Sequence, residues 1–332
     1  MSIWLHFFLF AVGIVLIVKG GDFFVDSASY IAEISGIPKF IVGATIVSLA
    51  TTMPEMLVSL MASFQGAALG DTPQAAGKYS MAVGNAIGSV TANTGLILSI
   101  AILFMTIAVS RKKYLVKSLL LIASVTTVWL GSLSGKLSLI ASLILLAIFA
   151  VFVYENIKSA KADLTGSEER PEFVKKDFIV KIVLFFVGAV MLVVGSNLLV
   201  NHGTPIAQFL HVPDGIIAVT MIAIGTSLPE LVTTITAIVK KQSSLSAGNI
   251  IGANIIDLTL ILPLSSLVSG GRLTIDSQGL TYDMPACLTV ILLAVLPMII
   301  TEKFRKWQGV AMLIAYAVYL FLIVRAGAGT VA

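Results

Sequence analysis

The chain has 332 residues, of which 58% are hydrophobic and 11% are charged, and its mean hydropathy is +1.03. Soluble domains carry about 25% charged residues, so this composition excludes a soluble enzyme or soluble binding module. The net charge of +4 does not indicate a nucleic-acid partner, because the basic residues are spread between apolar runs.

Apolar runs long enough for a helix of about 20 residues to cross a bilayer recur along the whole chain. The runs are continuous rather than alternating, which predicts helices and not barrel strands. We expect an all-α integral membrane protein with about ten transmembrane helices, near residues 4–20, 38–64, 80–108, 115–133, 136–155, 178–200, 212–238, 245–268, 283–300 and 307–325.

The basic residues are distributed unevenly between the two sides of this arrangement. With the N-terminus outside, 17 of the 21 Lys and Arg lie on the inner side, and the outer side has only Lys78, Lys136, Arg272 and Arg325. The positive-inside rule assigns the richer side to the cytoplasm. We therefore expect a multi-pass protein of the cell (plasma) membrane with both termini extracytoplasmic. A monomer is the simplest assembly.

The second half of the sequence repeats the first. A shift of 175 residues aligns Pro54-Glu55 with Pro229-Glu230, and a later shift of 164 aligns Gly84-Asn85 with Gly248-Asn249. We expect a first five-helix repeat at 1–155, a charged cytoplasmic linker at 156–177 and a second five-helix repeat at 178–332. Because five is odd, the two repeats enter the membrane in opposite senses. Inverted repeats are typical of secondary transporters, although some channels share them.

Three carboxylates are expected deep within the spans: Glu55, Glu230 and Asp257. A lone charge at that depth costs about 2.5–3.5 kcal/mol, and no Lys or Arg is expected at matching depth. Bound cations or protons are left as the compensating charge.

The residues next to these acids in the sequence can supply further oxygen ligands. Pro54 and Pro229 each precede a Glu and lack an N–H, so the carbonyls of about Ser48 to Thr51 and Ala223 to Thr226 are expected to lose their helical partners. Carboxylate, hydroxyl and freed carbonyl oxygens are the ligands that calcium prefers.

Four sequence blocks carry a resemblance to a known family. A Gly-Thr-Ser-x-Pro-Glu type occurs at 50–55 and 225–230, and a Gly-Asn-x-x-Gly-Ser/Ala type at 84–89 and 248–253. They resemble the two alpha repeats of the calcium/cation antiporter superfamily, most of all its prokaryotic sodium/calcium exchanger branch. The resemblance extends over essentially the whole chain, including Trp307-Gln308-Gly309.

The resemblance implies a secondary antiporter, not an enzyme, that exchanges calcium for sodium by alternating access without a prosthetic group. It implies that Glu55 acts with Thr51 and Thr52, Glu230 with Thr226 and Ser227, and Ser89 with Asn93, and that Asp257 completes the centre. It also implies that the long first and sixth helices, with Gly20-Gly21 and Gly195, slide over the core. With the freed carbonyls added, the expected metal-binding residues are Ser48, Thr51, Thr52, Glu55, Ser89, Asn93, Ala223, Thr226, Ser227, Glu230 and Asp257.

Two alternatives stay open. Ala253 stands where the family has a Ser hydroxyl that would bind sodium, which favours proton/calcium exchange by the same fold. A passive cation channel is the other. No Gly-x-x-x-x-Gly-Lys-Ser/Thr loop occurs, so no nucleotide is expected. The three histidines, His6, His202 and His211, are scattered, and we expect no metal role for them.

Overall fold

The computed structural model describes residues 2–105, 111–164, 174–210, 227–301 and 303–329. Within these ranges the secondary structure is helical, apart from one isolated bridge between Lys136 and Thr274. The first half contains α1 (Ile3–Ser35), α2 (Lys39–Val42), η1 (Gly43–Val47), α3 (Ser48–Thr51), α4 (Met53–Ala68), α5 (Pro73–Ala92), η2 (Asn93–Leu98), α6 (Ser99–Phe104), α7 (Arg111–Gly131) and α8 (Leu139–Leu164). The second contains α9 (Lys175–Phe209), α11 (Leu228–Val239), α12 (Ser243–Ile256), η3 (Asp257–Ile261), α13 (Leu262–Val268), η4 (Gly279–Asp283), α14 (Met284–Thr301) and α15 (Lys306–Gly329). The η elements are π-helical turns.

Eight helices in the described ranges are long and apolar enough to cross a membrane. The helix pair Lys39–Thr51 and Met53–Ala68, bent by 45° at its break, counts as a ninth span when taken together. The span expected at 212–238 falls largely on residues 211–226, outside the described ranges, and only its end is seen as α11. The all-helical membrane fold is therefore confirmed.

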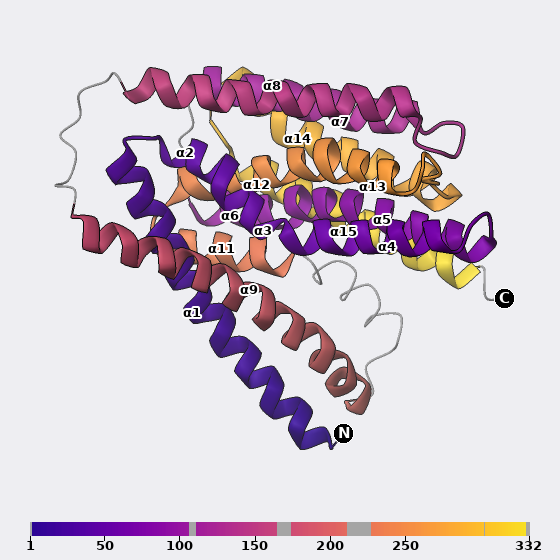
Figure 1. Ribbon diagram of the computed structural model, residues 1–332, viewed down its shortest axis with the longest axis horizontal. Helices are drawn as coiled ribbons and strands as arrows, with labels where there is room; N and C mark the ends of the chain where they lie inside the picture. The colour runs from indigo at the N-terminus through magenta and orange to yellow at the C-terminus, as the bar shows by residue number, and fades with distance from the viewer. Residues whose placement is uncertain (1, 106–110, 165–173, 211–226, 302, 330–332) are drawn as a thin grey trace.

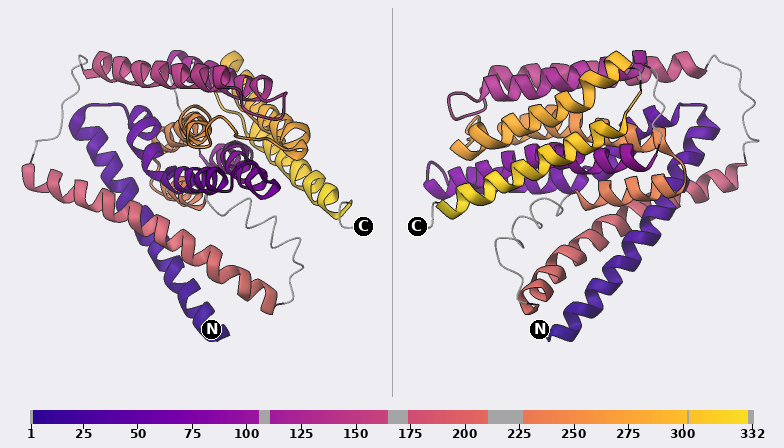
Figure 2. Two further views of the ribbon diagram at one scale, coloured as in Figure 1. Left: turned by 45° about the vertical axis from the view of Figure 1, so that its right-hand side comes forward. Right: turned by 180° about the vertical axis from the view of Figure 1, so that it is seen from behind.

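Helices α1 and α9 are much longer than the apolar runs that predicted them. They have 33 and 35 residues, respectively, so each is about 50 Å long, whereas the hydrocarbon core is about 30 Å thick. A helix of that length must tilt or extend beyond the hydrocarbon. Figures 1 and 2 show the pair lying side by side and crossing the other helices obliquely.

The α1/α9 pair packs antiparallel through glycines. A Cβ atom on Gly20 would lie 3.0 Å from the Gly188 carbonyl oxygen, and one on Gly13 would lie 3.1 Å from the Gly195 carbonyl oxygen. Small residues of this kind allow two helix backbones to approach closely in a membrane. Further along, the rings of Phe24 and Phe185 stack with centroids 4.5 Å apart.

Helix α12 lies at the centre of the remaining helices and is buried from Leu245 to Ile256. It packs so closely against α2 and η1 that two positions in the contact, Gly43 and Gly248, have no space for a side chain. A Cβ on Gly43 would overlap the Leu245 carbonyl oxygen, and one on Gly248 would overlap the Phe40 carbonyl oxygen. This contact fixes the position of α3, which carries Thr51, relative to α12.

Among the basic side chains that the structure describes, one is fully buried. Lys117 on α7 is only 2% exposed, and its Nζ donates a hydrogen bond to Asn156 Oδ1 on α8 at 2.5 Å. The same Nζ lies 5.6 Å and 5.5 Å from the ring centroids of Phe40 and Phe152, within the range of a cation–π contact. The sequence placed this lysine at the inner end of its span.

Candidate ion-binding site

Two helix breaks have the same local structure in the two halves. Thr52 precedes α4 with φ −82° and ψ 0°, and Ser227 precedes α11 with φ −84° and ψ 8°. Each helix has a proline and then a glutamate, Glu55 or Glu230, in its first turn. The unpaired N–H groups at a helix N-terminus favour a negative charge there. The backbone therefore partly offsets the cost of burying each carboxylate.

The carbonyl groups before Pro54 differ from the expectation. The Ser48 carbonyl oxygen accepts the Thr52 N–H at 2.9 Å, the Thr52 hydroxyl at 2.8 Å and the Thr51 hydroxyl at 3.3 Å. The prediction that this carbonyl loses its partner is therefore wrong. The missing N–H of Pro54 affects the carbonyl four residues earlier, which is that of Ala50.

Glu230 and Asp257 lie close together in the protein interior, and both are 0% exposed. The Glu230 carboxylate lies within reach of the Thr51 hydroxyl and feels the negative charge of Asp257. The Asp257 carboxylate in turn lies within reach of the Ser89 hydroxyl. Among the described residues, none gives the four oxygens of these two acids a hydrogen bond of good geometry. Buried carboxylates in this situation are suited to binding cations.

Ser89 joins the two halves at this point. Its Oγ accepts hydrogen bonds from Asn93 Nδ2 at 3.2 Å and from the Ser227 hydroxyl at 3.4 Å. Ser227 is the residue at the break before α11, whereas Ser89 and Asn93 belong to the first half. Oxygens from both halves therefore meet around Glu230 and Asp257.

The asparagine of the first Gly-Asn block, on α5, forms hydrogen bonds to α4, the helix that carries Glu55. Asn85 Nδ2 donates to the Glu55 backbone carbonyl at 3.1 Å and to the Ser59 hydroxyl at 2.9 Å. Glu55 itself is 0% exposed. Asn85 belongs to the first Gly-Asn motif, but it is not one of the expected site residues.

The second Gly-Asn block does the same for the helix that carries Glu230. Asn249 Nδ2 donates to the Thr233 hydroxyl at 3.2 Å, and this hydroxyl donates to the Glu230 backbone carbonyl at 3.0 Å. Asn249 Oδ1 also accepts the Thr51 hydroxyl at 3.1 Å. Asn249 thus connects α12 to α3 and α11. The repetition of Gly-Asn in the two halves was the signal that could have identified both asparagines.

Asn93 and Asp257 each begin a π-helical turn, η2 and η3. A π-turn adds one residue to a helical turn, which rotates the side chains that follow, and such turns are frequent at functional sites. Next to these turns, Asn254 Nδ2 donates to the Thr94 hydroxyl at 2.7 Å across the two halves. The sequence did not predict the π-turns.

Nine of the eleven expected site residues are described, and all nine are at most 4% exposed. Ala223 and Thr226 lie outside the described ranges. The described residues contain no group of three or more His, Cys, Asp or Glu side chains placed to hold a metal ion. A cation at this site would therefore also use hydroxyl, amide and carbonyl oxygens, which suits a hard ion such as calcium or sodium.

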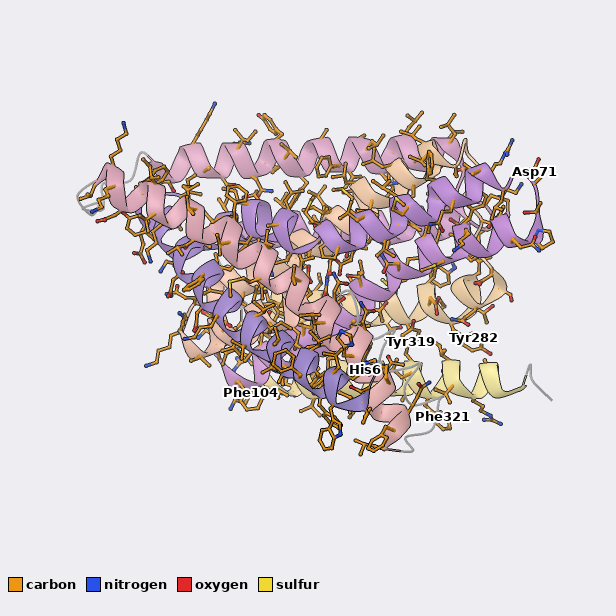
Figure 3. The ribbon with its side chains drawn as sticks, turned by 60° about the horizontal axis from the view of Figure 1, so that its bottom comes forward. His6, Asp71, Phe104, Tyr282, Tyr319 and Phe321 are labelled. Atoms are coloured by element: carbon orange, nitrogen blue, oxygen red, sulfur yellow. The ribbon has the colours of Figure 1, made fainter. Side chains whose placement is uncertain are left out.

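A fourth acid is also largely buried. Asp283, at the end of η4, is 7% exposed, and its Oδ1 accepts the Tyr319 hydroxyl at 3.2 Å. Figure 3 shows Tyr319 on α15. The sequence placed Asp283 at a span end, so its burial was not predicted.

A model of the sodium/calcium exchanger protein family matches residues 5–158 and 180–325. The sodium/calcium exchanger MaX1 of Methanosarcina acetivorans is 27% identical over 364 residues, which cover 97% of this chain and 99% of that protein. The putative antiporter CaxA of Alkalimonas amylolytica is 30% identical over 318 residues, which cover 94% of this chain and 96% of that protein. The solved structure of the sodium-calcium exchanger NCX_Mj soaked with zero Na⁺ and Ca²⁺ superposes with a TM-score of 0.78 at 28% identity, covering 97% of this chain and 100% of that chain.

Proposed function

This chain belongs to the sodium/calcium exchanger protein family and is an antiporter of sodium and calcium, and we propose that both ions bind around Glu55, Glu230 and Asp257. The observation that carries this proposal is that Glu230 and Asp257 are both 0% exposed and that Glu230 feels the negative charge of Asp257 across the interior. Two adjacent negative charges in an apolar interior strongly oppose each other. One divalent cation, or several monovalent cations, neutralises them.

Competition between the two ions follows from this arrangement. Calcium takes about 6–8 oxygens, and the set offered here consists of carboxylates, the hydroxyls of Thr51, Ser89 and Ser227, and the Asn93 amide. Sodium prefers the same kinds of oxygen, so the two ions use overlapping ligands and one displaces the other. The proposed binding residues are Thr51, Thr52, Glu55, Ser89, Asn93, Ala223, Thr226, Ser227, Glu230 and Asp257. Ser48 is left out because its carbonyl oxygen accepts three hydrogen bonds.

Alternating access is assigned to the α1/α9 pair moving as one unit over the other helices. The pair is held together by glycine contacts along its length, whereas ionic contacts tie it to the core at one end. Lys240, just after α11, lies 3.2 Å from Asp22 and 2.8 Å from Asp26 on α1. These side chains are partly exposed, and each such contact is worth at most about 1 kcal/mol. They are weak enough to break during transport.

The ten-span arrangement with inverted repeats is supported by pairs of equivalent elements. The breaks at Thr52 and Ser227 share one backbone conformation, and Asn93 and Asp257 both begin π-turns. The antiparallel packing of α1 on α9 is what opposite orientation of two repeats requires. We propose repeats at 1–155 and 178–332, joined by a linker at 156–177. Helix α8 continues into the linker as far as Leu164.

The sidedness predicted from charge is supported by contacts at the two ends of the protein. On the proposed cytoplasmic side, Lys39 lies 2.7 Å from Glu33, and its Nζ donates to Gln242 at 2.9 Å. On the other side, Arg272 lies 3.5 Å from Asp71. Basic residues assigned to one side thus contact residues assigned to the same side. We propose that both termini are extracytoplasmic.

Sodium-driven calcium flux tests the proposed function. The purified chain is reconstituted into sodium-loaded liposomes, which are diluted into sodium-free buffer that contains radioactive calcium. We expect calcium to accumulate because outward sodium flow drives its entry, and equal sodium on both sides is the control. Uptake that needs no sodium gradient and follows an imposed pH gradient would contradict the exchange of sodium. Discrete single-channel current steps would contradict a carrier.

Asn249→Ala tests whether this amide positions the ligands. Its removal leaves the hydroxyls of Thr51 and Thr233 without their amide partner, so both can turn away from Glu230. We expect the calcium concentration for half-maximal uptake to rise about 10–100-fold, as when the groups that orient metal ligands are removed. Asn201→Ala, at an exposed position of α9, is the matched control. An unchanged calcium dependence would show that Asn249 does not position the site.

A further inference from the structure

Two histidines that lie far apart in the sequence meet at one end of the α1/α9 pair. The Nδ1 atoms of His6 on α1 and His202 on α9 are 3.0 Å apart, and the ring centroids are 5.1 Å apart. Figure 3 shows His6 where α1 lies against the last turns of α9. The expectation that the histidines are scattered is therefore wrong for this pair.

The distance between the two nitrogens fits a shared metal ion. Zinc binds imidazole nitrogens at about 2.0–2.1 Å, so two nitrogens on one ion lie roughly 3.0–3.4 Å apart. The ring planes of His6 and His202 are inclined by 63°, so the rings do not stack face to face. A hydrogen bond between the two Nδ1 atoms needs a proton on one and a lone pair on the other. If a metal ion replaces the proton between them, the lone pairs of both Nδ1 atoms can bind that ion.

The surroundings hold the pair in place and leave both imidazoles partly exposed. Gly13 and Gly195 bring the two backbones together on the bundle side of the pair, and Phe10 packs on Gly203 with a 3.3 Å approach to its ideal Cβ position. Both histidines are only half-buried. Trp4, on the same end of α1, is 78% exposed, as expected for an aromatic anchor at the membrane–water interface.

We propose that His6 and His202 form a binding site for a late first-row divalent cation such as Zn²⁺ or Cu²⁺. Imidazole suits these ions, whereas calcium and sodium prefer oxygen ligands. Water completes the coordination. The bound ion cross-links α1 to α9, and it is bound separately from the transported ions because the ion-binding site lies in the core helices.

Metal binding to the purified full-length chain tests this site. Zn²⁺ is titrated calorimetrically into calcium-free protein, and we expect one ion per chain with an affinity at least about 10-fold lower in His6→Asn and in His202→Asn. The third histidine provides the matched control, so His211→Asn should bind Zn²⁺ as the unsubstituted chain does. Equal losses in all three variants, or none in the first two, would overturn the proposal.

The number of histidines that bind the ion is measured with Cu²⁺. Electron paramagnetic resonance of the unsubstituted chain should show coupling to two imidazole nitrogens, and each single variant should show one. A signal from one imidazole or none in the unsubstituted chain would overturn the proposal even if a variant folds poorly. Neither metal measurement involves transport. A negative result would therefore count against the histidine site alone, because sodium/calcium exchange is tested separately by the flux experiment.

Discussion

Glu230→Gln is expected to reduce sodium-driven calcium uptake to below about 1% of that of the unsubstituted chain. The amide keeps the size of the side chain but removes a full negative charge from the pair formed with Asp257. It also replaces one carboxylate oxygen with an N–H₂ group, which repels a cation. The measurement is radioactive calcium uptake into proteoliposomes at equal amounts of reconstituted protein.

Thermal unfolding separates this loss of binding from a loss of fold. Burying a neutral amide costs less than burying a carboxylate, so in calcium-free buffer the variant should be at least as heat-stable as the unsubstituted chain. Calcium should raise the unfolding temperature of the unsubstituted chain and leave that of the variant unchanged, because only binding to the folded state stabilises it.

Glu33→Gln makes the same chemical change at a partly exposed carboxylate that pairs with Lys39. An exposed pair contributes at most about 1 kcal/mol, so this control should retain most of the flux. Glu230→Gln protein that transports calcium normally would refute the site assigned here.

The two helix breaks could be predicted from the sequence because they depend on a local covalent property. Proline has no N–H, so a helix can begin at Pro54 or Pro229 but cannot run through either residue with an unbroken set of backbone hydrogen bonds. The glutamates follow each proline directly, which placed them in the first turn of the next helix. The expectation for the carbonyls was too broad: Pro54 affects the carbonyl of Ala50, whereas the Ser48 carbonyl keeps its bonds to the backbone and side chain of Thr52.

Other features depend on contacts between distant segments and left no local signal. The apolar run of α1 stops at Lys19, yet the helix continues to Ser35, and its second half buries Phe24, Val25 and Ile31 against α9 and α11. The π-turns at Asn93 and Asp257 each add a residue inside a continuous helical stretch, and no change in the sequence pattern marks the extra residue. His6 and His202 are 196 residues apart, and only the antiparallel packing of their helices joins them.

Gly248→Ala is expected to have the second large effect, on both folding and transport. The added methyl group would overlap the Phe40 carbonyl oxygen, which belongs to the backbone and cannot rotate away. Overpacking typically costs about 1–3 kcal/mol, and we expect the upper part of that range because α12 is buried on every side. The apparent unfolding temperature, followed by fluorescence in detergent, should fall.

The same substitution should also reduce calcium transport in the protein that does fold. If α12 moves away from α2 and η1, Asn249 separates from Thr51, and the Thr51 hydroxyl is no longer held beside Glu230. Gly77→Ala on α5 is the matched control, because a Cβ there meets no atom within 4 Å and alanine is favoured over glycine in a helix by about 1 kcal/mol. Equal stability and flux in the two variants would mean that close contact between α12 and α2 does not determine the geometry of the ion-binding site.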